Sequence, residues 1–183
     1  MTEDNYKGTG AVFVRSFVRS RGPEAEARLL AKLSPEDAER YLRTLAFDWI
    51  PIATISRIFE AAAPLAFPGN ADAMRLLGRE MARDHLRGIY RFLLRITTVA
   101  FVMTQTARLW STYHRKGVAH LAENTAPNMI TLVVSDYPEL PERFRECMCG
   151  YIVGTMELVG VQEIRVHKLG DASSQWQWRI SWK

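Results

Sequence analysis

The chain of 183 residues has only two cysteines, Cys147 and Cys149, and no long apolar run. The cysteines lie two positions apart on a predicted helix, where side chains point about 200° apart, so neither a mutual disulfide nor a shared metal is expected. The apolar runs are far shorter than the roughly 18 residues of a membrane-spanning helix, and residues 1–5 have neither the basic nor the hydrophobic part of a leader. These absences predict a cytoplasmic protein without a membrane span.

Motifs of common catalytic sites are also missing. The sequence has no Gly-x-x-x-x-Gly-Lys phosphate loop, no Gly-x-Gly-x-x-Gly, no Gly-x-Ser-x-Gly elbow and no His-Glu-x-x-His. No pair of carboxylates stands out by its spacing, and Cys147, on an apolar helix face, favours inert packing over nucleophilic chemistry. We therefore predict that the chain is not an enzyme and expect no metal and no cofactor.

The sequence has the composition of an ordinary folded domain, with 48% hydrophobic and 24% charged residues and no linker-like or repeated segment. We predict a single domain over residues 1–183, with a helical part over 8–116 and a sheet-bearing part over 117–183. Apolar residues that recur every three to four positions predict helices over 10–20, 23–33, 34–45, 49–63, 71–96 and 98–116. The clearest start is Ser34-Pro35-Glu36-Asp37, an N-cap hydroxyl followed by proline and acids.

The periodicity changes after Gly117. Residues 118–123 and 129–135 predict one hairpin, residues 161–169 and 175–182 a second, and residues 140–159 an apolar-striped helix between them. On the last strand the apolar side chains alternate with polar ones and comprise Trp176, Trp178, Ile180 and Trp182. The predicted fold class is α+β: an N-terminal helical layer packed on a mainly antiparallel sheet of about four strands, with a helix inserted between the two hairpins. We expect the tryptophans to form the floor of a packed or ligand-sized interior.

Two glycines, Gly150 and Gly154, lie at the edge of the apolar stripe of the helix over 140–159. Small residues at this spacing allow two helices to approach closely, either within the chain or between two copies of it. We favour close packing within the chain.

Several motifs together resemble an uncharacterised family abundant in myxobacteria. They are Leu109-Trp110 and Tyr113 before Gly117, the hairpin, Cys147-x-x-Gly150, Glu157-x-x-Gly160 and Trp178-Arg179-x-x-Trp182. That family is similar to the haem-dependent nitric-oxide-binding domains and to the four-vinyl-reductase and Golgi-transport modules, which share a ligand-binding α+β fold. The resemblance covers nearly the whole chain and implies a sensory, ligand-binding or partner-binding domain.

The same resemblance weighs against haem. The nitric-oxide-binding relatives use a histidine at a position that falls near Trp110 here, and their Tyr-x-Ser-x-Arg motif for the haem propionates is absent. His114 lies one turn further on, beside Arg115 and Lys116, where we expect it to cap the end of its helix.

His85 faces the apolar side of its predicted helix, with Met81 and Phe92 nearby and Gly88 leaving space beside it. A neutral core histidine is the simpler interpretation, because no second ligand residue lies on that face; the alternative is a ligand contact. The candidate pocket residues are His85, Phe92, Trp110, Tyr113 and Tyr151.

Arginines recur every four residues at positions 75, 79, 83, 87, 91 and 95, and residues 75–116 carry a net charge of +7 in a chain of net charge +4. Arg75, Arg79, Arg83 and Arg87 are a candidate surface for an anionic partner. Pairing with carboxylates of the same chain is the alternative. Nucleic acid is not expected, since no exposed strand interleaves aromatic and basic residues.

Two hypotheses follow. In the first, the chain is a non-enzymatic sensory or interaction domain in bacterial signalling, which docks a protein partner or forms a homodimer through the arginines or a sheet edge. In the second, it binds an apolar small molecule in a cavity between the helices and the sheet. The first is slightly favoured, because the residues that make the related pockets chemically active are missing.

Overall fold

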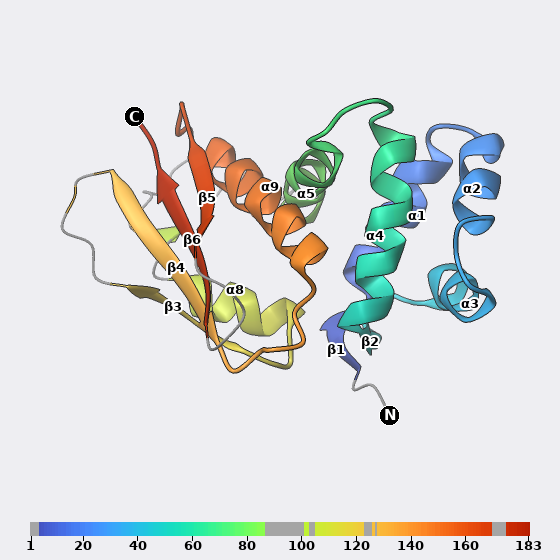
Figure 1. Ribbon diagram of the computed structural model, residues 1–183, viewed down its shortest axis with the longest axis horizontal. Helices are drawn as coiled ribbons and strands as arrows, with labels where there is room; N and C mark the ends of the chain where they lie inside the picture. The colour runs from blue at the N-terminus through green and yellow to red at the C-terminus, as the bar shows by residue number, and fades with distance from the viewer. Residues whose placement is uncertain (1–3, 87–100, 103–104, 123–125, 127, 170–174) are drawn as a thin grey trace.

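A helical layer and a four-stranded sheet face each other across helix α9 (Glu142–Leu158) in the computed structural model of the chain (Figure 1). The structure describes residues 4–86, 101–102, 105–122, 126, 128–169 and 175–183. The other helices are α1 (Thr9–Arg19), α2 (Pro23–Leu30), α3 (Pro35–Arg43), α4 (Ile52–Ala66), α5 (Ala73–His85) and α8 (Thr106–Tyr113). The strands are β1 (Asp4–Lys7), β2 (Trp49–Pro51), β3 (Val118–Ala122), β4 (Met129–Ser135), β5 (Arg165–Leu169) and β6 (Gln175–Ser181). The predicted α+β fold is confirmed.

The main sheet is antiparallel and has the strand order β3-β4-β6-β5. Both predicted hairpins form, and α9 connects them. Leu132 lies opposite Trp178, and Val134 lies opposite Trp176, so branched and aromatic side chains pair across the strands on one face. Trp178 is fully buried, whereas Trp182, after the end of β6, is only partly buried.

The cover over the two buried tryptophans is α9, as the sequence predicts, but one charged side chain forms part of it. Arg145 is 3% exposed, and its guanidinium carbon lies 4.2 Å from the centre of the Trp176 ring. An ion pair of 2.7 Å joins Arg145 to Glu142 at the protein surface. The aliphatic stem and planar head of arginine suit this place, because they cover an aromatic face while the charge keeps its partner.

Helices α5 and α9 cross in backbone contact. A Cβ atom added to Gly150 would lie 1.7 Å from the Arg75 carbonyl oxygen, and one added to Gly78 would lie 1.9 Å from the Cys147 carbonyl oxygen. Gly154 is also close, with 2.7 Å from its virtual Cβ to the Arg79 carbonyl oxygen. The glycines therefore serve close packing inside the chain, which is the interpretation that the sequence favours.

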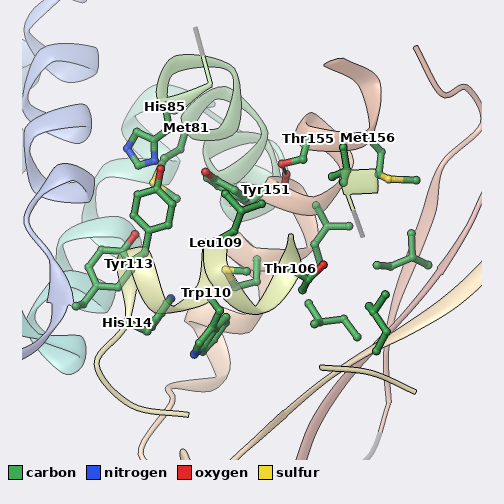
Figure 2. A pocket seen from close by; sticks show the side chains of 17 residues that line it. Met81, His85, Thr106, Leu109, Trp110, Tyr113, His114, Tyr151, Thr155 and Met156 are labelled. Atoms are coloured by element: carbon green, nitrogen blue, oxygen red, sulfur yellow. Dashed lines mark hydrogen bonds between the residues drawn. The ribbon is translucent and has the colours of Figure 1, made fainter. Parts of the chain in front are cut away.

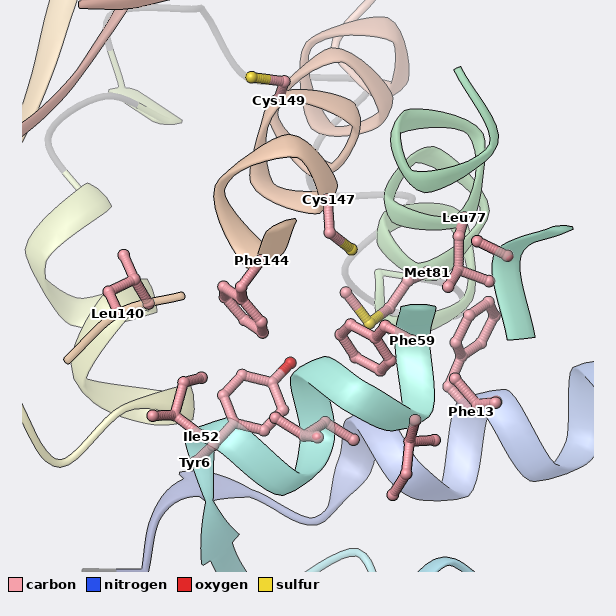
Figure 3. Packing of buried hydrophobic residues seen from close by; sticks show 14 of the residues in the cluster. Tyr6, Phe13, Ile52, Phe59, Leu77, Met81, Leu140, Phe144, Cys147 and Cys149 are labelled. Carbon is pink, nitrogen blue, oxygen red and sulfur yellow. The ribbon is translucent and has the colours of Figure 1, made fainter. Parts of the chain in front are cut away.

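The hydrophobic core lies between α9, α5, α4 and α1 and continues onto the sheet. Figure 3 shows Cys147 pointing toward Phe59 and Met81, and Cys149 pointing another way. Both thiols are free and buried, so the predicted core position of Cys147 is confirmed. Cys149 is buried as well because α9 is covered on two sides, by the helices and by β5.

In the helical half, the prediction for residues 49–63 is wrong at its start. Trp49–Pro51 forms strand β2, which pairs with β1. The helix begins only at Ile52, whose backbone N–H donates to Asn5 Oδ1 at 3.1 Å. The predicted start at Ser34 is confirmed, since its hydroxyl accepts a 3.1 Å hydrogen bond from the Asp37 N–H.

The helices predicted over 71–96 and 98–116 are described only in part. Their described segments are helical over 73–85 and 106–113, and residues 87–100 lie outside the described residues. Within the described part of the chain, no helix combines the length and apolar character needed to cross a membrane.

Candidate functional site

A cavity of about 100 Å³ lies between α5, α8, α9 and the sheet (Figure 2). Its surface is almost entirely apolar. The lining residues are Tyr6, Met81, His85, Val102, Thr106, Leu109, Trp110, Tyr113, His114, Leu121, Leu132, Met148, Tyr151, Ile152, Thr155, Met156 and Ile180. Helices from both parts of the chain therefore border a small apolar space above the sheet.

Four of the five candidate pocket residues line this cavity together: His85 from α5, Trp110 and Tyr113 from α8, and Tyr151 from α9. The fifth, Phe92, lies outside the described residues. The prediction that the tryptophans of the last strand form the floor of the cavity is wrong for Trp176 and Trp178. Ile180 of β6 lines the cavity, and these two tryptophans do not. The two tryptophans lie under Arg145 instead, where Trp178 donates a 3.3 Å hydrogen bond to the Arg145 carbonyl oxygen.

His85, Tyr113 and Tyr151 meet at one end of the cavity, which we call the polar corner. The ring centres of His85 and Tyr113 are 5.3 Å apart with nearly parallel planes, and those of His85 and Tyr151 are 6.0 Å apart. By distance and angle, neither ring nitrogen of His85 nor the Tyr151 hydroxyl has a hydrogen-bond partner in the described chain, although the Thr9 backbone lies near His85 and the Tyr113 hydroxyl lies near Tyr151. Such buried groups are rare in folded proteins and indicate a position with a role beyond packing.

Burial determines the charge state of the polar corner. It lowers the pKa of His85 below the ordinary value of a histidine, more than the backbone of Thr9 and the Asp84 carboxylate raise it. Burial also raises the pKa of Tyr151 well above its ordinary value, with a further contribution from the nearby Tyr113 hydroxyl. Both groups are therefore neutral at pH 7, and the neutral imidazole has one N–H donor and one nitrogen acceptor.

His114 lies at the C-cap position of α8, but its side chain does not act as the predicted cap. The ring is 5% exposed and stacks on Trp110, with 3.9 Å between ring centres. Tyr6 and Phe144 close the other sides. Full burial lowers the pKa of His114 to about 3, so the ring is neutral and belongs to the core. The expectation of a capping side chain at His114 is wrong because residue 114 is extended and pairs with Tyr6 of β1, which places its ring in the core.

The buried His114 predicts a fold that weakens in acid. Its pKa is about 3 in the folded chain and about 6.5 in an unfolded one, so between these values the unfolded state binds the extra proton. The contribution of neutral His114 to the free energy of unfolding is fully present above the unfolded pKa. It is lost as the pH falls, by about 2 kcal/mol between pH 7 and pH 5. His85 adds to this in the same direction.

Urea unfolding of the wild type and of His114→Phe at pH 7 and pH 5 checks this expectation, because phenylalanine keeps the ring packing and cannot bind a proton. The variant should lose clearly less stability on acidification. His167→Gln, at an exposed position on β5, is the matched control and should behave like the wild type. An unchanged pH dependence in His114→Phe would show that this ring is not the acid-sensitive group.

The arginines of α5 face the carboxylates of α9. Arg75 pairs with Glu146 at 2.8 Å, Arg79 with Glu157 at 2.5 Å, and Arg83 with Glu157 at 3.1 Å. Their side chains are between 37% and 40% exposed. These contacts match the alternative of pairing within the chain, and Arg87 lies outside the described residues. Recognition of an anionic partner by this surface remains a prediction.

The described cavity does not fit haem. At about 100 Å³ it is smaller than the cavity of about 150 Å³ that admits a benzene molecule. None of its described lining residues is a lysine or arginine that could neutralise haem propionates. The described residues also contain no cluster of three or more His, Cys, Asp or Glu side chains suited to a metal ion.

A scan of the sequence against protein-family models and a search of the curated proteins found no match. Solved structures of H-NOX domains match over nearly the full chain. An unliganded Fe(II) H-NOX protein mutant from K. algicida has a TM-score of 0.68 at 13% identity, covering 97% of this chain and 96% of that one. A mutant H-NOX of T. Tengcongensis has a TM-score of 0.62 at 17% identity, covering 94% and 97%.

A third match is an oxygen-binding H-NOX domain related to soluble guanylate cyclases, with a TM-score of 0.63 at 18% identity, covering 97% of this chain and 95% of that one. The fold is therefore that of the H-NOX domains, which confirms the predicted relation to the haem-nitric-oxide-binding fold.

Sequence reasoning missed some of the lining. Tyr6 comes from β1, a short strand without a periodic signal, and Thr155 and Met156 lie on the part of α9 that faces the cavity. The helical spacing of Tyr151 and Thr155, four residues apart, is the one signal that could have placed Thr155 at the site. Nothing in the sequence indicates that Tyr6 reaches it.

Proposed function

We propose that this chain is a non-enzymatic sensory domain that binds a small, mainly apolar molecule in the cavity between α5, α8, α9 and the sheet. The observation that carries the proposal is the cavity itself, an apolar space in a core that is otherwise filled by large side chains. Protein interiors are packed as densely as organic crystals, so a space of this size has a cost that a ligand can offset.

The matched structures support a ligand-binding role but not the same ligand. They include an unliganded Fe(II) H-NOX protein, H-NOX proteins with a distorted haem and an oxygen complex of an H-NOX domain. Here the small cavity and the lack of lysine or arginine among the described lining residues disfavour haem. The proposal is therefore a sensor on the H-NOX fold that recognises its ligand directly through side chains.

The docking hypothesis now has weaker support than the ligand hypothesis. The described arginines of the candidate surface are engaged by Glu146, Glu157 and Glu80 of the same chain, which reduces the charge available to a partner. Protein association remains compatible with a sensor, because a sensory domain must pass its state to another protein.

Binding of a simple apolar probe tests the proposal. We expect toluene, added as a saturating solution, to raise the melting temperature of the wild-type chain by a few degrees, since a ligand at ten times its Kd adds about 1.4 kcal/mol to the stability. Ile152→Phe, which places extra volume into the cavity from α9, should abolish the shift.

Val118→Phe is the matched control, because it adds the same kind of ring at an exposed position of β3 and should leave the shift intact. Proton NMR of the methyl groups that line the cavity gives an independent measure of binding. If toluene moves neither the melting temperature nor these resonances, or if Ile152→Phe responds like the wild type, the cavity is not a binding site.

A further inference from the structure

The cavity has a polar end and an apolar end. Figure 2 shows His85, Tyr113 and Tyr151 toward one side, and Thr155 and Met156 toward the other. At the second side the threonine is satisfied internally, since its hydroxyl donates to the Tyr151 carbonyl oxygen at 2.9 Å. Trp110 is satisfied as well, through a 2.9 Å hydrogen bond from Nε1 to the Lys116 carbonyl oxygen. The unpaired atoms of α5 and α9 that line the cavity are therefore those of His85 and Tyr151, whereas Arg145 Nε lies over Trp176. His114 Nδ1 is also unpaired, but its ring is packed between Trp110, Tyr6 and Phe144.

The charge of the occupant follows from the lining. None of the lining residues that the structure describes is aspartate, glutamate, lysine or arginine. A carboxylate, a phosphate or an ammonium group would lose its hydration without gaining an opposite charge, which is strongly unfavourable in an apolar cavity. The occupant is therefore neutral.

The hydrogen-bonding group of the occupant follows from the polar corner. The Thr9 backbone raises the pKa of His85, so the ring N–H is directed toward the Thr9 carbonyl and the other ring nitrogen is left to accept one hydrogen bond. The Tyr151 hydroxyl can donate one. A single hydroxyl satisfies both, because it donates through its hydrogen and accepts through its oxygen. A carbonyl can only accept and a hydrocarbon can do neither, so each leaves a buried polar atom unpaired.

The size of the occupant follows from the volume. A cavity of about 100 Å³ lies below the roughly 150 Å³ that holds benzene in an engineered cavity, so a single six-membered ring is the upper limit for the apolar body and enters only when flexible lining side chains shift. Met81, Met148 and Met156 line the cavity and adapt readily to the shape of a guest.

We infer that the cavity binds a small neutral alcohol, a hydroxyl on an apolar body of at most one ring, with the hydroxyl between His85 and Tyr151. This inference rests on the proposed function and adds the chemical class and the orientation of the ligand. His85 and Tyr151 act as the specificity-determining pair, and the apolar residues provide affinity without selecting among rings.

Paired probes that differ in one group test the inference on the full chain. Phenol and toluene have nearly the same shape, and only phenol has the hydroxyl; cyclohexanol tests whether the ring must be aromatic, and benzoate tests charge. We expect calorimetric titration to show phenol and cyclohexanol binding about tenfold more tightly than toluene, in line with one buried hydrogen-bonded group, and benzoate not binding.

Variants then locate the hydroxyl. His85→Phe and Tyr151→Phe should each reduce the ratio of phenol to toluene affinity toward one, with toluene binding retained. Thr155→Val is the matched control: it removes a lining hydroxyl that already has a partner, so the ratio should stay near ten. Because the ratio is measured within each variant, a general loss of affinity does not affect it, and two independent variants guard against one that fails to fold.

The outcomes separate the inference from the proposed function. If toluene and phenol bind equally well to the wild type, the cavity is a ligand site and the inferred hydroxyl is wrong. If neither binds, the proposed function fails with it. If phenol is preferred but both phenylalanine variants keep that preference, the hydroxyl lies elsewhere in the cavity and the inferred orientation is overturned.

Discussion

Gly150→Ala is expected to destabilise the chain by roughly 3 kcal/mol or more, although alanine is the better helix former by about 0.5–1 kcal/mol. The added Cβ would lie 1.7 Å from the Arg75 carbonyl oxygen, so α5 and α9 must separate along a contact that also buries Leu77 and Cys147. Backbone atoms cannot move aside as the end of a flexible side chain can, which is why the effect is large.

Urea unfolding at pH 7 measures the loss. Gly154→Ala should cost less, since its nearest backbone contact is 2.7 Å from the virtual Cβ. Arg143→Ala, on an exposed turn of the same helix, is the control for helix propensity and should change the free energy of unfolding by less than about 0.5 kcal/mol. A neutral or stabilising Gly150→Ala would mean that the two helices are not in backbone contact.

Trp178→Ala is the second large prediction, with an expected loss of about 3–5 kcal/mol. The indole is fully buried between β6 and α9, and its removal leaves a large space and deletes the hydrogen bond to the Arg145 carbonyl oxygen. Leu132 on β4, which lies opposite Trp178, would also lose its cross-strand partner.

Trp182→Ala is the natural comparison, because the same residue type ends the same chain segment with part of its ring in solvent. It should cost clearly less than Trp178→Ala when both are measured by urea unfolding. Equal losses would contradict the assignment of the buried side of β6, and a small loss at Trp178 would show that the sheet is not covered there.

The sheet half of the fold could be predicted because its signals are local. Alternation of apolar and polar residues marks β4 and β6, and a continuous apolar stripe marks α9. The pairing of β1 with β2 could not be predicted, since each strand is short and the partners are more than forty residues apart. Cys149 was not assigned to the core because an amphipathic pattern indicates one buried face, and α9 has two.

At the candidate site, too, local sequence signals could be predicted and contacts between distant segments could not. His85 could be placed on an inward helix face, and Trp110, Tyr113 and Tyr151 could be named from their apolar stripes. The sequence could not show that Tyr151 lacks a partner, since that depends on how three helices meet. The i, i+4 spacing of Arg75, Arg79 and Arg83 likewise identifies a charged ridge but not the carboxylates of α9 opposite it.

The glycine crossing of α5 and α9 has a mechanical consequence for the cavity. The two backbones approach closely at Gly78 and Gly150, and the ion pairs of Arg75 with Glu146 and Arg79 with Glu157 connect the same two helices. We therefore expect the α5 and α9 helices, which carry His85 and Tyr151, to move together. Among the described helices that line the cavity, α8 lies outside this crossing. If the proposed ligand binds, we expect α8 to shift more than α5 and α9.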